Sequence, residues 1–246
     1  MDSNKFTPRL LGFMFVFVAV ASALGGLMLS SLSLPLVGPP DNIFETMISI
    51  SDNPTAMQMS IVCFLIEAIS IVLLTVLLYT TLKKQNKIIA RWAFGLWIIE
   101  AVFLAVREIN AFSLLYTSQE YVKAVAPDSS YFQTLGSLFY ELMQFSYDVQ
   151  MVFYCSGGIL FYYLFLRSKY VPKVLPIWGI IAASLGFIGE LFALFGYVVP
   201  LYVFLPILPF ELTIGIWLMV KGFNPAAIAS GSAKTDIKEF KMIKSK

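Results

Sequence analysis

Residues 57–82 read MQMSIVCFLIEAISIVLLTVLLYTTL, a run in which Glu67 is the only charged side chain. About 20 consecutive apolar residues are enough for a helix to cross the hydrocarbon core of a bilayer, so this stretch predicts a transmembrane helix. The whole chain agrees, because 59% of its 246 residues are hydrophobic and only 13% are charged, whereas a soluble domain carries about 25% charged residues. The composition therefore predicts an integral membrane protein.

Five further apolar runs accompany this one and leave no room for a separate soluble domain. The six expected spans are residues 10–34, 57–82, 89–116, 143–166, 174–197 and 200–222. Nothing breaks a helix between Tyr131 and Leu166, so the helix that contains the fourth span is expected to begin near Ser130. The sequence thus predicts an all-α fold, a polytopic bundle of six transmembrane helices in one domain over residues 1–223.

Two segments outside the spans carry signals of their own. Between the first two spans, Asn42 with Glu45 three residues later predicts a capped short helix, and the apolar side chains of residues 43–50 are expected in the headgroup layer. Residues 224–246 pass through Ser-Gly-Ser-Ala and end with lysines among apolar residues. This composition predicts a flexible, basic cytoplasmic tail, either solvated or resting on anionic lipid.

The distribution of Lys and Arg predicts the orientation. Of the 17 basic residues, all except Lys123 and Arg107 lie before the first span, at the end of the sixth or after it, or in the second-to-third and fourth-to-fifth connections and the span edges beside them. Cytoplasmic connections carry such an excess, so we expect a multi-pass protein of the cell membrane with both termini cytoplasmic. In an alternative interpretation residues 1–23 are a cleaved signal peptide, because two basic residues precede an apolar run that ends in Ala-Ser-Ala.

The composition also excludes several classes of chemistry. The chain has no His, which removes imidazole metal sites, His-ligated haem and Ser-His or Cys-His catalysis. Its two Cys are far apart and form no disulfide framework, and a net charge of +2 does not indicate nucleic acid as a partner. Neither a P-loop nor a Gly-x-Ser-x-Gly elbow occurs. We therefore predict no metal, no cofactor and no assigned catalytic residue.

Several segments of the chain are particular enough to compare with known families. They are RLLG at 9–12, RWA at 91–93 followed by IEA at 99–101, LRSKYVPK at 166–173, and PFEL at 209–212 through WLMVKG at 217–222. With these segments in this order, residues 9–223 resemble the bacterial integral membrane family catalogued as domain of unknown function 4386. The resemblance implies a six-helix membrane protein and brings no activity or catalytic residue with it.

Acidic residues inside the spans or at their edges are the strongest functional signal. They outnumber Arg107, the one basic residue that lies deep inside a span and not at its edge, and they are Glu67, Glu100, Glu108, Glu141, Asp148, Glu190 and Glu211. An ionised carboxylate at the centre of a bilayer costs about 2.5–3.5 kcal/mol. These acids must therefore be protonated, pair with Arg107, or line a wet cavity that can hold a cation.

Helical periodicity places these acids on faces shared with small or polar residues, which predicts that they turn inward. Glu100 and Arg107 are seven residues apart and aligned, as expected for an ion pair. On the fourth span a polar stripe contains Glu141 and Asp148, and aromatic residues that can receive a cation recur every seven positions beside it. The candidate ligand-binding residues are Glu67, Glu100, Arg107, Glu141, Asp148, Glu190, Glu211, Tyr147 and Tyr154.

Three functions are consistent with this pattern. In the first, the bundle binds or transports a cationic or small amphiphilic ligand in an acidic, Tyr-rich cavity that opens outward. In the second, it is an intramembrane enzyme that uses paired carboxylates, or an oxygen-ligated Mg²⁺, on a lipid or isoprenoid. In the third, it is a structural or sensory protein whose protonated acids and aromatic residues only knit the bundle together. The partners are the bilayer and this ligand, and the sequence does not specify an oligomeric state.

Overall fold

The computed structural model of the protein describes residues 3–35, 40, 42–124 and 128–227. Over these ranges all regular structure is helical, which confirms the all-α fold class. The elements in chain order are α1 (Ser3–Ser30), α2 (Ile43–Asp52), α3 (Pro54–Leu82), α4 (Lys87–Lys123), α5 (Asp128–Ser168), α6 (Val174–Leu194), η1 (Leu201–Val203, a 3₁₀ turn) and α7 (Ile207–Val220).

Six segments of the described chain are long and apolar enough to cross a membrane, as predicted. The first ends at Ser30 rather than at residue 34, because the chain turns there: the Leu32 N–H bonds to the Leu29 carbonyl at 2.9 Å, and Ser33 takes a left-handed φ of 59°. The last segment is apolar over Leu201–Val220. Its helix α7 has only 14 residues and so extends about 21 Å, less than the roughly 30 Å of hydrocarbon.

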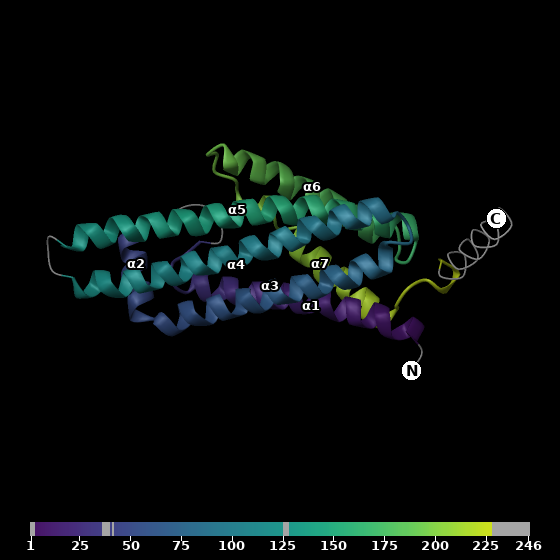
Figure 1. Ribbon diagram of the computed structural model, residues 1–246, viewed down its shortest axis with the longest axis horizontal. Coiled ribbons are helices and arrows are strands. Elements are labelled where there is room, and N and C mark those ends of the chain that lie inside the picture. The colour runs from purple at the N-terminus through teal and green to yellow at the C-terminus, as the bar shows by residue number, and fades with distance from the viewer. Residues whose placement is uncertain (1–2, 36–39, 41, 125–127, 228–246) are drawn as a thin grey trace, which may run out of the picture.

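The helices α4 and α5 are much longer than a membrane is thick. With 37 and 41 residues they extend about 55 and 60 Å, and at the end remote from the termini they project past the other helices (Figure 1). The helix of the fourth span, α5, begins at Asp128, close to the start near Ser130 that the sequence predicts. The helix of the third span, α4, continues past residue 116 to Lys123, because none of the polar residues there breaks a helix.

The short helix α2 packs across this projection, mainly against α4. The Asn42 side chain accepts a hydrogen bond from the Phe44 N–H at 3.0 Å, which confirms the predicted cap. The sequence predicts that the apolar side chains of α2 lie in the headgroup layer. Two of them do not, because Met47 and Ile50 are fully buried inside the protein. Gly136 of α5 makes room for Met47, since a Cβ at residue 136 would collide with the Met47 sulfur.

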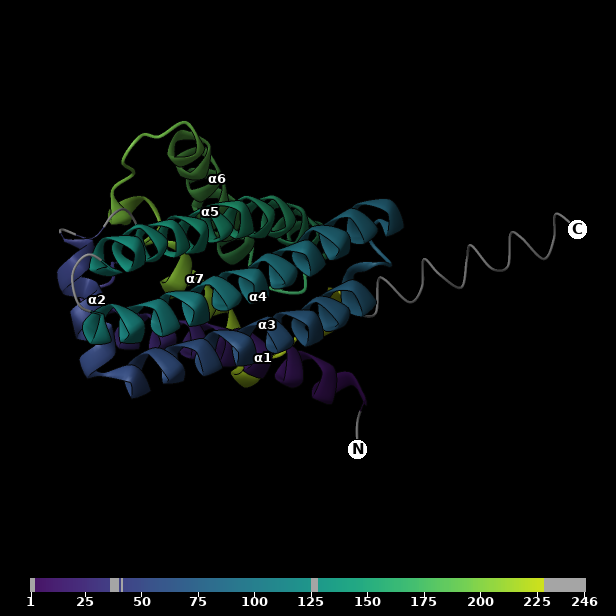
Figure 2. The same cartoon turned by 60° about the vertical axis from the view of Figure 1, so that its left-hand side comes forward.

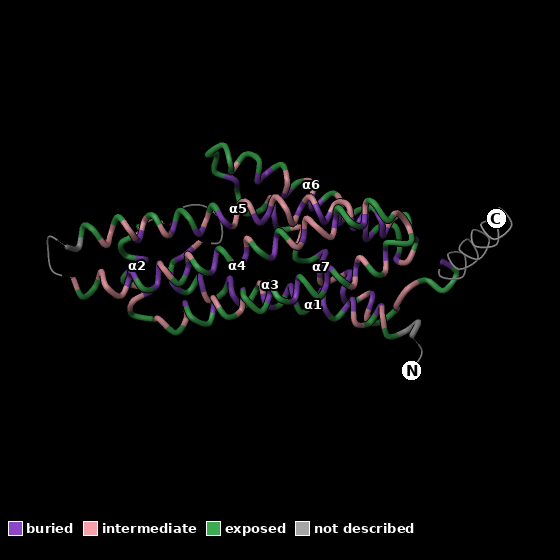
Figure 3. The backbone as a smooth tube through the Cα atoms, in the orientation of Figure 1, coloured by how far each residue is buried: buried purple, intermediate pink, exposed green. Residues whose placement is uncertain are grey.

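The spans form a bundle in which α5 packs against α4, α4 against α3, α3 against α1 and α1 against α7. The helix α6 lies on α5, and its end nearest η1 leans away from the other helices (Figures 1 and 2). Buried residues line the facing sides of the helices and exposed residues cover their outer sides (Figure 3). Many of the exposed side chains are large and apolar, as contact with lipid requires.

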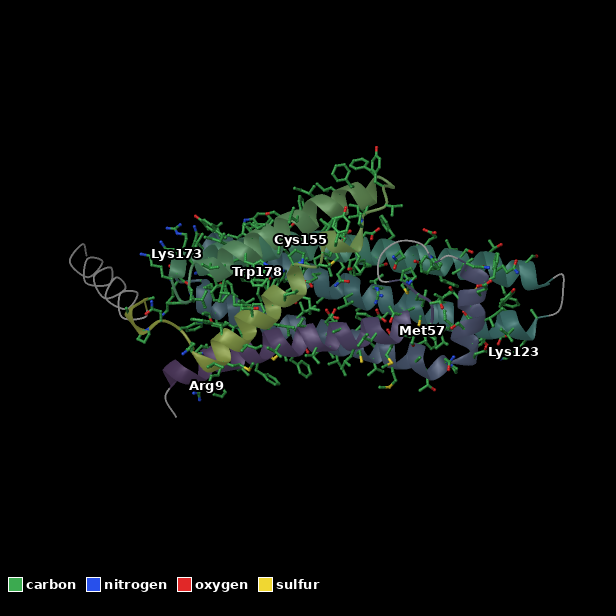
Figure 4. The ribbon with its side chains drawn as sticks, turned by 180° about the vertical axis from the view of Figure 1, so that it is seen from behind. Arg9, Met57, Lys123, Cys155, Lys173 and Trp178 are labelled. Carbon is green, nitrogen blue, oxygen red and sulfur yellow. The ribbon has the colours of Figure 1, made fainter. Side chains whose placement is uncertain are left out.

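The two ends of the bundle differ in charge. The N-terminal and C-terminal ends of the described chain lie together at the same end of the bundle (Figure 1). Arg9 and Lys173 are at that end and Lys123 is at the opposite one (Figure 4), as the sequence predicts. Most of the predicted tail, residues 228–246, lies outside the described residues.

Candidate functional site

A cavity of about 450 Å³ lies between α1, α3, α4, α5 and the segment from η1 into α7. Its volume is in the range that holds a small organic molecule. Most of its wall is apolar, with side chains such as Val18, Ile71 and Leu104. The polar or hydrogen-bonding residues that line it are Ser22, Ser30, Glu67, Trp97, Glu100, Tyr147, Gln150, Tyr154 and Glu211.

Three of the predicted acids share this cavity. Glu67 lies on α3, Glu100 on α4 and Glu211 on α7, and their exposed fractions are 6%, 2% and 8%. No Lys or Arg is among the described residues that line the cavity. The bundle therefore brings together three buried carboxyl groups from three helices without a basic side chain in the same wall.

The Glu211 carboxyl is held by Tyr154. The Tyr154 hydroxyl donates a hydrogen bond to Glu211 Oε1 at 2.7 Å. Trp97 fixes Tyr154 in turn: its Nε1–H donates to the Tyr154 carbonyl at 2.9 Å, and the two rings stack with their centroids 6.0 Å apart. Gly157 leaves room for this indole, because a Cβ there would collide with Trp97. The geometry of this part of the wall is therefore fixed by packing as well as by the hydrogen bond.

Three other polar atoms of the cavity wall have no partner. Among the described residues, Glu67 Oε2, Glu100 Oε2 and Gln150 Oε1 are buried without a hydrogen bond, although Ser22 lies beside the Glu67 carboxyl. Nearly all buried polar atoms in folded proteins find a hydrogen-bond partner or an ordered water. These oxygens are thus acceptors available to whatever fills the cavity.

Arg107 is not the partner of Glu100 that the sequence predicts. Its guanidinium pairs with the adjacent Glu108, and both side chains are buried. The Arg107 Cζ atom lies 4.3 Å from the centre of the Phe64 ring and 5.7 Å from that of Tyr147. Both rings line the cavity and Arg107 does not. The expected pair fails because seven residues separate Glu100 from Arg107 by about 10 Å along a helix.

The remaining predicted acids lie away from the cavity. Glu141 is exposed, so the prediction that it turns inward is wrong, and Asp148 is half-buried. Glu190 is buried on α6 near Asp148, and its Oε2 has no hydrogen-bond partner among the described residues. On α5 the aromatic stripe faces the cavity, through Tyr147 and Tyr154. The acidic stripe is turned about 100° from it and lies at the flank.

Gln150 and Trp97 belong to the site although they are not among the predicted residues. Gln150 is three residues after Tyr147 and four before Tyr154, and this spacing puts all three on one helix face. That spacing is a signal that the sequence contains. No sequence pattern predicts that Trp97 belongs to the site. Its place beside Tyr154 depends on the packing of α4 against Gly157 of α5.

The cavity opens sideways at membrane depth. Its exposed lining residues are Ala23, Leu27 and Ser30 on α1 and Leu208 on α7, and the rest of its wall is buried or half-buried. All four lie within membrane-spanning segments. The opening therefore lies between α1 and α7, in the half of the bundle remote from the termini.

The helices α1 and α7 approach closely in the other half of the bundle. Gly12 and Gly215 face each other there, and a Cβ on either would collide with a backbone oxygen of the other. The stripe of Ser22, Gly26 and Ser30 resembles a helix-packing surface in sequence. In the structure all three residues line the cavity instead.

Comparison with known proteins connects the chain to one family. No curated protein and no solved structure matches it. A family model does match, over residues 10–222, under the description domain of unknown function. The match covers the same stretch as the resemblance seen in the sequence and includes all six spans. The chain therefore belongs to the family described as domain of unknown function 4386 (DUF4386).

Proposed function

We propose that this protein binds an amphiphilic organic cation, which enters the cavity from the bilayer between α1 and α7. The observation that carries the proposal is the set of three buried carboxyl groups, Glu67, Glu100 and Glu211, in a cavity that no Lys or Arg of the described residues lines. Transport of the bound cation is the natural extension, since the cavity lies within a bundle of six membrane-spanning segments.

Charge balance favours a cationic ligand. Three ionised carboxylates inside a membrane cost on the order of 10 kcal/mol, which is comparable to the whole stability of about 5–15 kcal/mol of a typical protein. Each acid must therefore carry a proton or face a positive charge. A cationic head group supplies that charge, and it exchanges with the protons that balance the acids when the cavity is empty.

The cavity wall favours an organic cation over a metal ion. Among the described residues, no three acidic or thiol side chains lie close enough to ligate one metal ion. Apolar side chains make up most of the wall, and Leu27 and Leu208 flank the opening. Such a wall accommodates an alkyl chain, while the rings of Tyr147 and Tyr154 present faces to a quaternary ammonium group.

The orientation belongs to the same proposal. We infer that the protein lies in the cell membrane with both termini in the cytoplasm. This is supported by the basic residues at the end of the bundle that carries the termini, Arg9 and Lys173 among them (Figure 4). The cavity then opens in the outer half of the bilayer.

Calorimetric titration with dodecyltrimethylammonium tests the proposal. The purified full chain in neutral detergent should bind this probe, and Glu100→Gln should weaken binding about tenfold or more because it removes a buried charge. Glu141→Gln is the matched control, since Glu141 is an exposed acid outside the cavity. Dodecyl sulfate, which has the same chain and the opposite charge, should not compete. Equal effects of the two substitutions, or competition by dodecyl sulfate, would contradict the proposal.

A further inference from the structure

The connection between α5 and α6 packs against the end of α7, at the end of the bundle that carries the termini. The Asn224 N–H donates to the Tyr170 carbonyl at 2.9 Å, and the rings of Tyr170 and Phe223 stack with centroids 4.7 Å apart. Each segment makes a left-handed turn here, with φ 58° at Lys169 and 71° at Gly222. The first segment is LRSKYVPK at 166–173. The second is WLMVKG at 217–222 together with Phe223 and Asn224 directly after it. The two are far apart in sequence and meet in the fold.

Between these segments lies a second pocket, of about 410 Å³. Three lysines line it, Lys169 and Lys173 from the connection and Lys221 from the end of α7, together with Tyr170 and Trp217. No acidic residue of the described chain is in its wall, and it shares no lining residue with the acidic cavity. It is therefore a separate site of opposite charge.

The pocket lies at the membrane surface. The helix α5 ends at Ser168, α6 begins at Val174 and α7 ends at Val220, so three spans leave the hydrocarbon around it. Trp and Tyr side chains prefer this depth, where one edge of the ring is apolar and the other is wet. Basic pockets between membrane helices at this level suit anionic lipid head groups.

We propose that this pocket binds the head-group phosphate of an anionic phospholipid. The three ammonium groups supply hydrogen-bond donors and charge to the phosphate, and Trp217 packs beside the glycerol and the first acyl carbons. The hydrogen-bonded turns hold the lysine backbones in place, and the pocket gathers three lysines from two segments of the chain. Ser168 adds to this hold, because its Oγ accepts a hydrogen bond from the Tyr170 N–H at 3.2 Å.

Native mass spectrometry of the full chain in neutral detergent tests this inference, because a neutral micelle has no anionic surface to attract lysines in general. Phosphatidylglycerol, phosphatidylcholine and inorganic phosphate are added separately. The double substitution Lys173→Gln and Lys221→Gln should weaken phosphatidylglycerol binding about thirtyfold. The matched control is Lys84→Gln with Lys87→Gln, which removes two exposed charges at the same end but outside the pocket.

The expected result is selective binding of phosphatidylglycerol that the pocket pair weakens and the control pair leaves within about twofold. Equal weakening by both pairs would overturn the inference, because it would show attraction by charge alone. Equal affinity for phosphatidylcholine would also overturn it. Binding of inorganic phosphate as tight as that of the lipid would show a site for free anions and not for lipid. The four lysines are exposed, so both pairs should melt at the temperature of the unmodified protein when no lipid is added.

Discussion

At the scale of single residues, Glu100 and Glu108 show how neighbours decide the role of a buried acid. Both are 2% exposed, but Glu108 is paired with Arg107 whereas Glu100 Oε2 has no partner among the described residues. Replacing Glu108 with Gln leaves the buried guanidinium without its counter-charge, so we expect a loss of about 3–5 kcal/mol of stability.

Glu100→Gln should instead leave the stability of the ligand-free protein unchanged or raise it, because it removes a buried carboxyl group that has no ion pair with a described basic side chain. Thermal unfolding in detergent compares the two variants directly. If Glu100→Gln destabilised the protein as much as Glu108→Gln does, Glu100 would be a structural acid and the proposed ligand site would lose a member.

Tyr154 supports a second prediction at this scale. Tyr154→Phe removes the hydroxyl that donates to Glu211, while its ring can still stack on Trp97. We expect a loss of about 1–2 kcal/mol, the usual contribution of such a hydrogen bond, and weaker binding of dodecyltrimethylammonium. Tyr163→Phe is the control, because Tyr163 is exposed and outside the cavity. A Tyr154→Phe variant indistinguishable from Tyr163→Phe would mean that the hydrogen bond does not hold the site.

The sequence predicted that the acids turn inward, but it could not fix how each helix is rotated in the bundle. Glu67, Glu100 and Glu211 share a cavity, whereas Glu141 is exposed although it has the same periodicity arguments behind it. Periodicity gives the relative angle of two residues on one helix. It does not give the rotation of that helix in the bundle, which depends on packing at contacts such as Trp97 against Gly157.

At the scale of elements, hydropathy predicted the six spans and misjudged where their helices end. Hydropathy reports which residues suit hydrocarbon, whereas a helix continues until a residue breaks it. For this reason α4 extends to Lys123, past the end of the apolar run. The last span is apolar throughout, but it contains a 3₁₀ turn, η1, before α7 begins at Ile207. The start of α7 matters for the site, because Leu208 there lines the cavity and is exposed.

The opening between α1 and α7 gives a prediction for these two elements. Ala23→Trp places a large ring in the exposed wall of the cavity, so it should weaken binding of dodecyltrimethylammonium about tenfold, the consequence of about 1.4 kcal/mol. Val20→Trp is the matched control, because Val20 is exposed on the same helix and does not line the cavity. Calorimetric titration measures both. Similar affinities for the two variants would show that the ligand does not pass this opening.

At the scale of the whole molecule, the inferred orientation is open to a labelling experiment. In a background of Cys63→Ala and Cys155→Ala, single cysteines replace Lys84 at the basic end or Lys123 at the opposite end. A membrane-impermeant maleimide added to intact cells should label Lys123→Cys and leave Lys84→Cys unlabelled until the cells are opened, because basic connections stay in the cytoplasm. The reverse pattern would contradict the orientation and would put the opening in the inner half of the bilayer.

We propose that the bundle encloses a cation among three acids in a cavity that no described Lys or Arg lines. A crystal structure of the full chain with (12-bromododecyl)trimethylammonium tests it most directly, because anomalous scattering locates the bromine. We expect the ammonium group among Glu67, Glu100 and Glu211, with the bromine at the opening beside Leu27 and Leu208. Density for the probe only on the outer faces of the helices, with the three carboxyl groups bonded to one another in a closed cavity, would contradict it.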